Sequence, residues 1–225
     1  MSRGLLFCGM LSGVVMLSSA WAGEYDNQGF EAPAFQPGNL AGQDGWQMPD
    51  VGGTPDGAVV ESAVGQDGSQ AVVLRNTDQR VLIRKVAKND GAHWIDITML
   101  PPRKEAIVTN LSINLRGKTG TGEYGILATV SLNGSGSVNG LPAKPEALYR
   151  KEDWNRLTIH IKPEEGTYDL YLNDVLAGAG LPLNGGPGAG MVDAYEVDWT
   201  GASAYAESST VIDRFTITEE TPLRP

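Results

Sequence analysis

The chain has 225 residues, with 27 acidic and 17 basic side chains and a formal net charge of −10. This charge excludes nucleic acid and anionic lipid surfaces as partners, because binding to either depends on clustered Lys and Arg side chains. With 29 Gly, 13 Pro and no apolar run at 3.6-residue spacing long enough for a packed helix, the sequence predicts short strands separated by turns.

The first 22 residues have the pattern of a secretory signal peptide. Arg3 gives a positive start, an apolar stretch runs from Leu5 to Leu17, and Ala20 and Ala22 form a small-x-small cleavage site. The apolar stretch is shorter than the roughly 20 apolar residues that a membrane-spanning helix needs. We therefore expect cleavage after Ala22 and export to the periplasm or the extracellular medium, without membrane insertion.

Residues 23–225 are predicted to form a single β-sandwich domain, since all-β domains of about 200 residues are common and no linker interrupts this one. The only cysteine, Cys8, would be removed with the signal peptide. Burial of apolar side chains and sheet hydrogen bonds must then stabilise the mature chain without a disulfide.

Alternating apolar and polar residues predict a series of strands along the mature chain. In chain order, they cover residues 58–64, 70–76, 79–86, 93–99, 111–116, 126–132, 157–161, 167–173, 195–200 and 211–218. On this pattern Ile126, Ile159 and Phe215 face the core. Sheets with one apolar face must be covered, so the fold class is all-β, an antiparallel two-sheet jelly-roll sandwich.

Three segments carry a family resemblance. They are residues 30–46 (FEAPAFQPGNLAGQDGW), 153–173 (DWNRLTIHIKPEEGTYDLYLN) and 211–217 (VIDRFTI). Their order resembles that of concanavalin A-like, laminin-G-like jelly-roll domains of secreted bacterial proteins, the lectin/glucanase type. The resemblance implies that the last strand returns beside the first and that one concave sheet presents polar side chains to sugar. It implies little about activity, because lectins, adhesion modules, glycosidases and polysaccharide lyases share the fold.

The same alternation predicts a polar face that could bind a ligand. The side chains expected to project from one sheet face into a shared groove are those of Trp94, Asp96, Asn114, Arg116, His160, Glu196 and Asp198. Carboxylates and amides can hydrogen-bond to sugar hydroxyls, and an exposed indole can stack on a sugar ring. The alternative is an ordinary solvated sheet face, with Trp94 covered by a loop. Trp46 and Trp154 are interpreted as framework and Trp199 as core.

Two enzymatic interpretations stay open but incomplete. The string from Glu196 to Thr200 resembles the opening of the Glu-x-Asp-x-x-Glu or Glu-x-Asp-x-Glu signature of laminarinase-type glycoside hydrolases. Gly201 and Thr200 stand where the second glutamate of these two variants would lie. A polysaccharide lyase would need His160 beside Arg116 and Asn114, and its anionic substrate would have to approach a chain of net charge −10.

Metal binding is also left open. Calcium is conceivable because Asp44, Asp67, Asp193, Asp198 and Asp213 lie in or near predicted turns, but no contiguous loop supplies the six to eight oxygens that calcium prefers. No other cofactor is expected.

Taken together, the sequence favours a secreted non-catalytic binding module for extracellular carbohydrate, a polysaccharide or glycan. The alternatives are a structural or adhesion protein without a small-molecule site and, less favoured, a carbohydrate-active enzyme. The oligomeric state is open.

Overall fold

The computed structural model describes residues 25–26, 29–48, 57–75, 81–101, 110–119, 121–132, 137–138, 140–141, 147–148, 150, 152–187, 192–200 and 209–222. The predicted signal peptide lies outside these described residues. In the described segments no helix has the length and hydropathy needed to cross a membrane.

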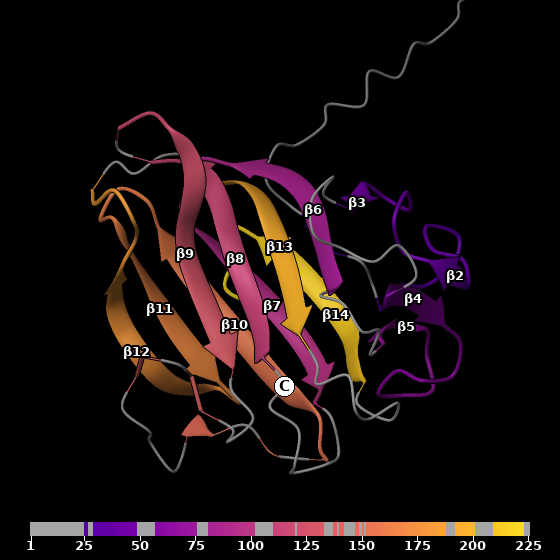
Figure 1. The fold of residues 1–225 in the computed structure, drawn as a ribbon. Coiled ribbons are helices and arrows are strands. Elements are labelled where there is room, and N and C mark those ends of the chain that lie inside the picture. Colours follow the sequence, from indigo (N-terminus) through magenta and orange to yellow (C-terminus); the bar gives the residue numbers. More distant parts are fainter. Residues whose placement is uncertain are drawn as a thin grey trace, which may run out of the picture.

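The described residues form two antiparallel sheets packed face to face (Figure 1). The strands are β1 (Tyr25–Asp26), β2 (Gly38–Asn39), β3 (Trp46–Gln47), β4 (Ala58–Glu61), β5 (Ala71–Leu74), β6 (Val81–Asn89), β7 (His93–Leu100), β8 (Asn110–Lys118), β9 (Tyr124–Leu132), β10 (Asn155–Lys162), β11 (Thr167–Leu172), β12 (Val175–Pro182), β13 (Val192–Thr200) and β14 (Thr210–Thr218). The predicted two-sheet sandwich is confirmed.

The larger sheet has nine strands and the smaller has five. In the nine-stranded sheet the order is β12-β11-β10-β7-β14-β5-β4-β2, with β1 also paired to β14; in the five-stranded sheet it is β3-β6-β13-β8-β9. Because Tyr25 pairs with Ile217, the last strand does return beside the first, as the family resemblance implied.

The core lies between the two sheets and is built from the predicted apolar faces. Ile159 of β10 and Phe215 of β14 are fully buried, which confirms their predicted inward orientation. Trp46 and Trp199 are also buried, in agreement with their framework and core interpretations. The ring of Phe215 contacts that of Trp46 at a centroid distance of 5.2 Å.

The predicted inward orientation of Ile126 is wrong. The pairing of β8 with β9 shifts register next to Leu115, so that Arg116 lies opposite Ile126. Such a bulge reverses the side on which the residues before it emerge. Leu127 therefore enters the core, whereas Ile126 is 37% exposed on the outer face.

Strand β12 was not predicted at all. Its sequence, VLAGAGLP, contains two glycines and no apolar-polar alternation, and its pairing with β11 is irregular. It lies at the edge of the nine-stranded sheet, where weak strand propensity is tolerated because only one neighbour must be paired.

Candidate functional site

The predicted site residues lie on two opposite faces of the sandwich. The outer face of the nine-stranded sheet carries Trp94 and Asp96 from β7 and His160 from β10, whereas that of the five-stranded sheet carries Asn114 and Arg116 from β8 and Glu196 and Asp198 from β13. The inner faces of the sheets pack together, so their outer faces point away from each other. The predicted shared groove is therefore wrong. The alternation of apolar and polar residues predicts which side chains share one side of a strand, but it does not predict which of the two sheets the strand joins.

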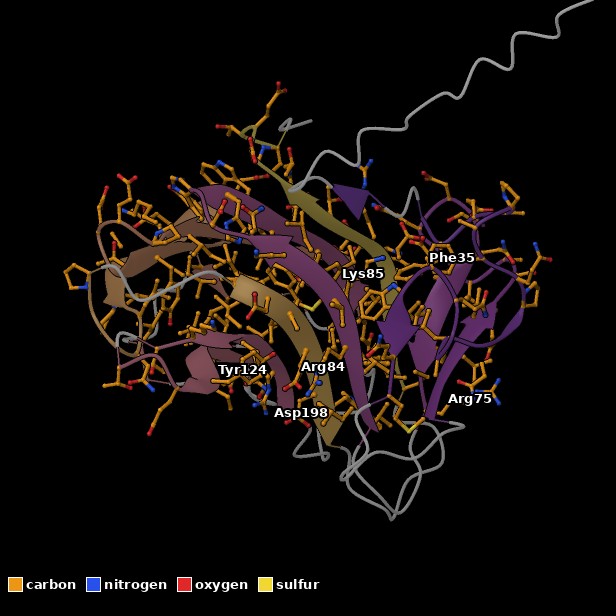
Figure 2. All side chains as sticks on the ribbon, turned by 90° about the horizontal axis from the view of Figure 1, so that it is seen from above. Phe35, Arg75, Arg84, Lys85, Tyr124 and Asp198 are labelled. Carbon is orange, nitrogen blue, oxygen red and sulfur yellow. The ribbon has the colours of Figure 1, made fainter. Side chains whose placement is uncertain are left out.

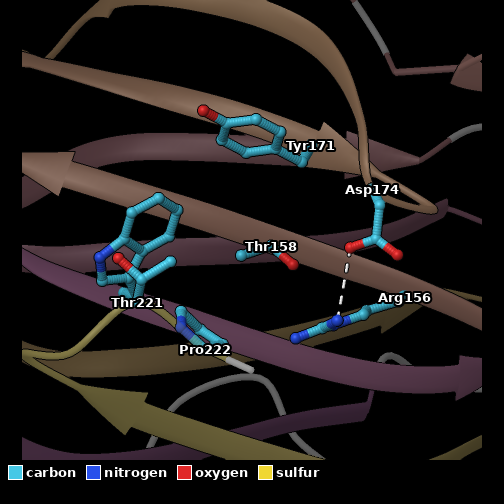
Figure 3. Close-up of a pocket in the computed structure, with 7 residues that line it drawn as sticks. Arg156, Thr158, Tyr171, Asp174, Thr221 and Pro222 are labelled. Atoms are coloured by element: carbon cyan, nitrogen blue, oxygen red, sulfur yellow. Dashed lines mark hydrogen bonds and ion pairs between the residues drawn. The ribbon is translucent and has the colours of Figure 1, made fainter. Parts of the chain in front are cut away.

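Trp94 is covered and offers no open stacking platform. Its ring lies parallel to that of His160, with centroids 3.9 Å apart, and the residue is only 9% exposed. Thr221 and Pro222, which follow β14, line a small cavity with Trp94 and Tyr171 (Figure 3). The alternative interpretation, in which Trp94 is covered by another segment, is the correct one. Burial lowers the pKa of His160, although Asp169 nearby opposes the shift.

A much larger groove of about 650 Å³ opens beside this cavity on the same sheet face. A row of three side chains lines it: Thr98 of β7 lies opposite Arg214 of β14 on one side and Arg156 of β10 on the other. Neighbouring strands are about 4.8 Å apart, so the row spans about 10 Å. Trp154, directly before β10, and the exposed Arg150 also line the groove.

A buried amide fixes the segment that carries Trp154. The side chain of Asn155 accepts a hydrogen bond from the Arg150 N–H (2.6 Å) and donates to the carbonyl oxygens of Arg150 (2.8 Å) and Asp153 (2.7 Å). Asn173 donates a further hydrogen bond to the Asn155 Oδ1 at 2.9 Å. Asn155 is only 2% exposed, and its role is to orient this segment.

Asp96 holds Arg156 in the wall of the groove. The Asp96 carboxylate accepts hydrogen bonds from Arg156 Nε (2.8 Å) and Thr158 Oγ1 (2.7 Å) and is 5% exposed. Arg156 Nη1 also lies 3.3 Å from Asp174 (Figure 3). Burial by itself would lower the pKa of Arg156, but the contacts with Asp96 and Asp174 together outweigh it and the pKa is raised. Arg156 and Asp174 line both the groove and the Trp94 cavity and so separate the two.

On the opposite face, Glu196 is fully buried beneath two arginines. Arg84 donates to Glu196 from Nε (2.8 Å) and Nη2 (2.5 Å), and Arg116 donates from Nε (2.5 Å). Asn114 accepts a hydrogen bond from Thr129 at 2.8 Å and is 4% exposed. Figure 2 shows Arg84 and Asp198 on the same outer side of this sheet. Ligand contact by the four predicted residues of this face stays a prediction, and for Glu196 it would have to pass through the arginines.

The second histidine, His93, belongs to the core. Its Nδ1 lies 2.7 Å from the Gly91 carbonyl oxygen and its Nε2 lies 2.8 Å from the Tyr195 hydroxyl, so one histidine links β7 to β13 across the sandwich. Burial lowers the pKa of His93 to about 4. The ring is therefore neutral at pH 7 and out of reach of solvent.

The groove residues missed in the sequence include Arg150, Trp154, Arg156 and Arg214. Trp154 was interpreted as framework, yet it has the same parity as Arg156 and His160, so extending the alternation of β10 backwards would have placed it on the polar face. Arg214 follows a register shift in β14 that places both Ile212 and Phe215 on the inner side. No sequence signal marks that bulge.

No metal site emerges from the described part of the chain, in which no three His, Cys, Asp or Glu side chains gather. Asp213 instead accepts hydrogen bonds from Ser69 Oγ (3.0 Å) and the Gln66 N–H (3.3 Å) and so orders a turn. Calcium binding stays an untested expectation.

Comparisons with known proteins identify the fold. No family model and no curated protein sequence matches the chain. Among solved structures, a Bacillus licheniformis β-glucanase is 11% identical, aligns over 88% of this chain and 99% of its own, and gives a TM-score of 0.52. A carbohydrate esterase from the Shiga toxin-encoding bacteriophage phi24B is 15% identical over 77% of this chain and 89% of its own, with a TM-score of 0.51. A sialidase is 8% identical over 88% of this chain but only 18% of its own, with a TM-score of 0.54.

At these identities the likeness concerns the fold alone. The chain is a β-sandwich of the concanavalin A-like type.

Proposed function

We propose that the protein is a secreted, non-catalytic binding module for extracellular carbohydrate, and that the groove on the nine-stranded sheet is its binding site. The amino-terminal pattern ending at Ala22 supports export. The narrower laminin-G-like assignment is part of the same proposal and rests on the sequence resemblance alone. Structural likeness to a glucanase, an esterase and a sialidase adds support, since the names of all three refer to carbohydrate chemistry.

The observation that carries the proposal is the composition of the groove. Its volume of about 650 Å³ lies in the range of small-ligand sites. Trp154 supplies an indole that is only partly buried, on which the apolar face of a sugar ring can stack. Gln66, Thr98 and Arg150 supply partly or fully exposed polar groups around it, which suits the many hydroxyls of a saccharide.

The carboxylates of the groove favour binding over hydrolysis. Glycoside hydrolysis needs two carboxyl groups placed on either side of the scissile bond. Within the described lining, the two carboxylates are Asp96 and Asp174, and both are bound to the single guanidinium of Arg156. Both carboxylates are therefore engaged in holding Arg156 in the lining of the groove.

A glycan array on the mature protein, with polysaccharide turnover assayed alongside, tests the proposal. We expect binding without turnover, by a protein that starts at Gly23. Trp154→Ala should weaken binding at least about tenfold, which corresponds to about 1.4 kcal/mol of lost stacking. Leu176→Ala is the control, because Leu176 is an exposed large apolar residue (39%) that does not line the groove.

The possible results of these experiments distinguish the functional hypotheses. Turnover of a bound polysaccharide would contradict the non-catalytic part, and full binding by Trp154→Ala would contradict the site. Absence of binding to every glycan tested would favour the structural or adhesion alternative.

A further inference from the structure

We propose that the outer face of the five-stranded sheet is a second, independent site that binds the anionic group of an acidic saccharide, a carboxylate or a sulfate. The inference goes beyond the groove, which lies on the opposite face of the sandwich.

The centre of this site is the Arg84–Glu196–Arg116 cluster. Glu196 is fully buried, and its two oxygens accept hydrogen bonds from different arginines. Two guanidinium groups share one carboxylate, so the cluster has a net charge of +1 in a chain of net charge −10. The carboxylate beneath them holds the two arginines side by side, which lowers the conformational entropy lost when they bind a ligand.

Both arginines keep donors for a ligand. Glu196 occupies Nε and Nη2 of Arg84 and Nε of Arg116. Their remaining N–H groups have no further hydrogen bond to the residues that the structure describes, and about a quarter of each side chain is exposed (27% for Arg84 and 25% for Arg116). A guanidinium group presents its N–H donors in a planar fork that matches a carboxylate or a sulfate.

Apolar side chains gather beside these donors. Four large apolar residues are the most exposed in the described segments, and three of them, Val86, Tyr124 and Ile126, lie on this face. Val86 of β6 and Ile126 of β9 belong to one row across the sheet, which runs Val86, Ala194, Arg116, Ile126. Exposed apolar groups that cluster in this way mark binding surfaces.

The composition of this row indicates which kind of ligand would fit the face. It crosses four strands and so spans about 14 Å, with a guanidinium group between two apolar side chains. A saccharide chain could lay the apolar faces of its rings on Val86 and Ile126 and direct an acidic substituent to Arg116. Nucleic acid fits poorly, because its binding needs many clustered cations, whereas the two guanidinium groups of this cluster lie on the same face as the carboxylates of Glu196 and Asp198.

The test uses variants that leave the buried ion pairs intact. Replacing either arginine would leave Glu196 underpaired and endanger folding, so the change is made at the exposed Ile126 instead. Ile126→Glu places a carboxylate opposite Arg116, where it competes with the ligand for the free donors. Ile126→Gln has nearly the same shape without the charge and is the matched control.

The mature protein and its variants are titrated calorimetrically with a galacturonate hexasaccharide, a sulfated heparin hexasaccharide and neutral cellohexaose. We expect at least one acidic probe to bind, with affinity that falls in about 0.5 M NaCl. Ile126→Glu should lose at least about tenfold in affinity and Ile126→Gln no more than about threefold. Binding of the galacturonate hexasaccharide shows that a carboxylate suffices, whereas binding of the heparin hexasaccharide alone shows that sulfate is required.

Trp154→Ala separates this site from the groove. We expect it to leave acidic-probe binding unchanged, whatever happens to glycan binding in the groove. Loss of acidic-probe binding in Trp154→Ala with retention in Ile126→Glu would overturn the proposal, because the acidic ligand would then lie in the groove. Equal affinity of Ile126→Glu and Ile126→Gln, or no binding of either acidic probe, would overturn it as well.

Discussion

At the scale of single residues, burial decides which polar side chains can meet a ligand. Glu196 and Asp96 both lie on outer sheet faces, yet each is buried and bound by arginine. Trp94 is covered, whereas Trp154 lines an open groove. The sequence pattern does not distinguish a covered tryptophan or carboxylate from an exposed one, because exposure depends on the segments that fold over each side chain. The candidate contact residues of the proposed sites, such as Trp154, are therefore neighbours in sequence or space of the residues that the alternation singled out.

His93 makes the protein sensitive to acid. An unfolded histidine has a pKa of about 6.5, and burial lowers the pKa of His93 in the folded protein to about 4. Between these values the unfolded chain binds a proton that the folded protein does not, so the free energy of unfolding falls as the pH falls from about 6.5 to about 4. The whole loss is about 3 kcal/mol, and it is complete below about pH 4.

Urea unfolding at a series of pH values measures this loss. In His93→Gln this part of the pH dependence should disappear, although the variant will be less stable at pH 7 because its contact with Tyr195 is disturbed. His160→Gln is the control and should keep most of the dependence. An unchanged pH profile in His93→Gln would show that other groups cause the acid sensitivity.

At the scale of strands, alternation predicted the long strands and their buried sides, as Ile159 and Phe215 show. It failed wherever the period of two is interrupted. The register shift beside Leu115 moved Ile126 outward, and the shift in β14 moved Arg214 to the groove. Strand β12 escaped prediction because its glycines and alanines form no alternating pattern, so its pairing with β11 is known only from the folded chain.

The turn between β10 and β11 offers a test of close backbone packing. Gly166 has a φ of +65°, and a Cβ there would lie 2.3 Å from backbone atoms of Gly186 and Pro187. Gly68 has a similar φ of +73°, but nothing lies within 4 Å of its Cβ position. Gly68→Ala should lose about 1–2 kcal/mol from the left-handed conformation alone. Gly166→Ala should lose about 1–3 kcal/mol more, because the backbone must move apart.

Chemical unfolding of the two variants checks this comparison at one pH and temperature. Equal losses would show that residues 186–187 do not constrain the turn.

At the scale of the whole molecule, topology determines which side chains can share a site. The sandwich was predictable because every long strand has one apolar face that must be covered. Sheet membership was not, since nothing local in β7 or β13 indicates that one joins the nine-stranded sheet and the other the five-stranded sheet. One predicted site therefore became two separate surfaces, and the first of them contains a groove of about 650 Å³.

The most direct test of the central claim follows the tryptophan indole N–H resonances of the mature protein by ¹⁵N NMR during titration with a saccharide found on the array. The account predicts that the Trp154 resonance shifts to saturation with the binding isotherm, while those of the buried Trp46 and Trp199 stay in place. Saturable binding that leaves the Trp154 resonance unchanged would contradict the assignment of the groove as the carbohydrate site.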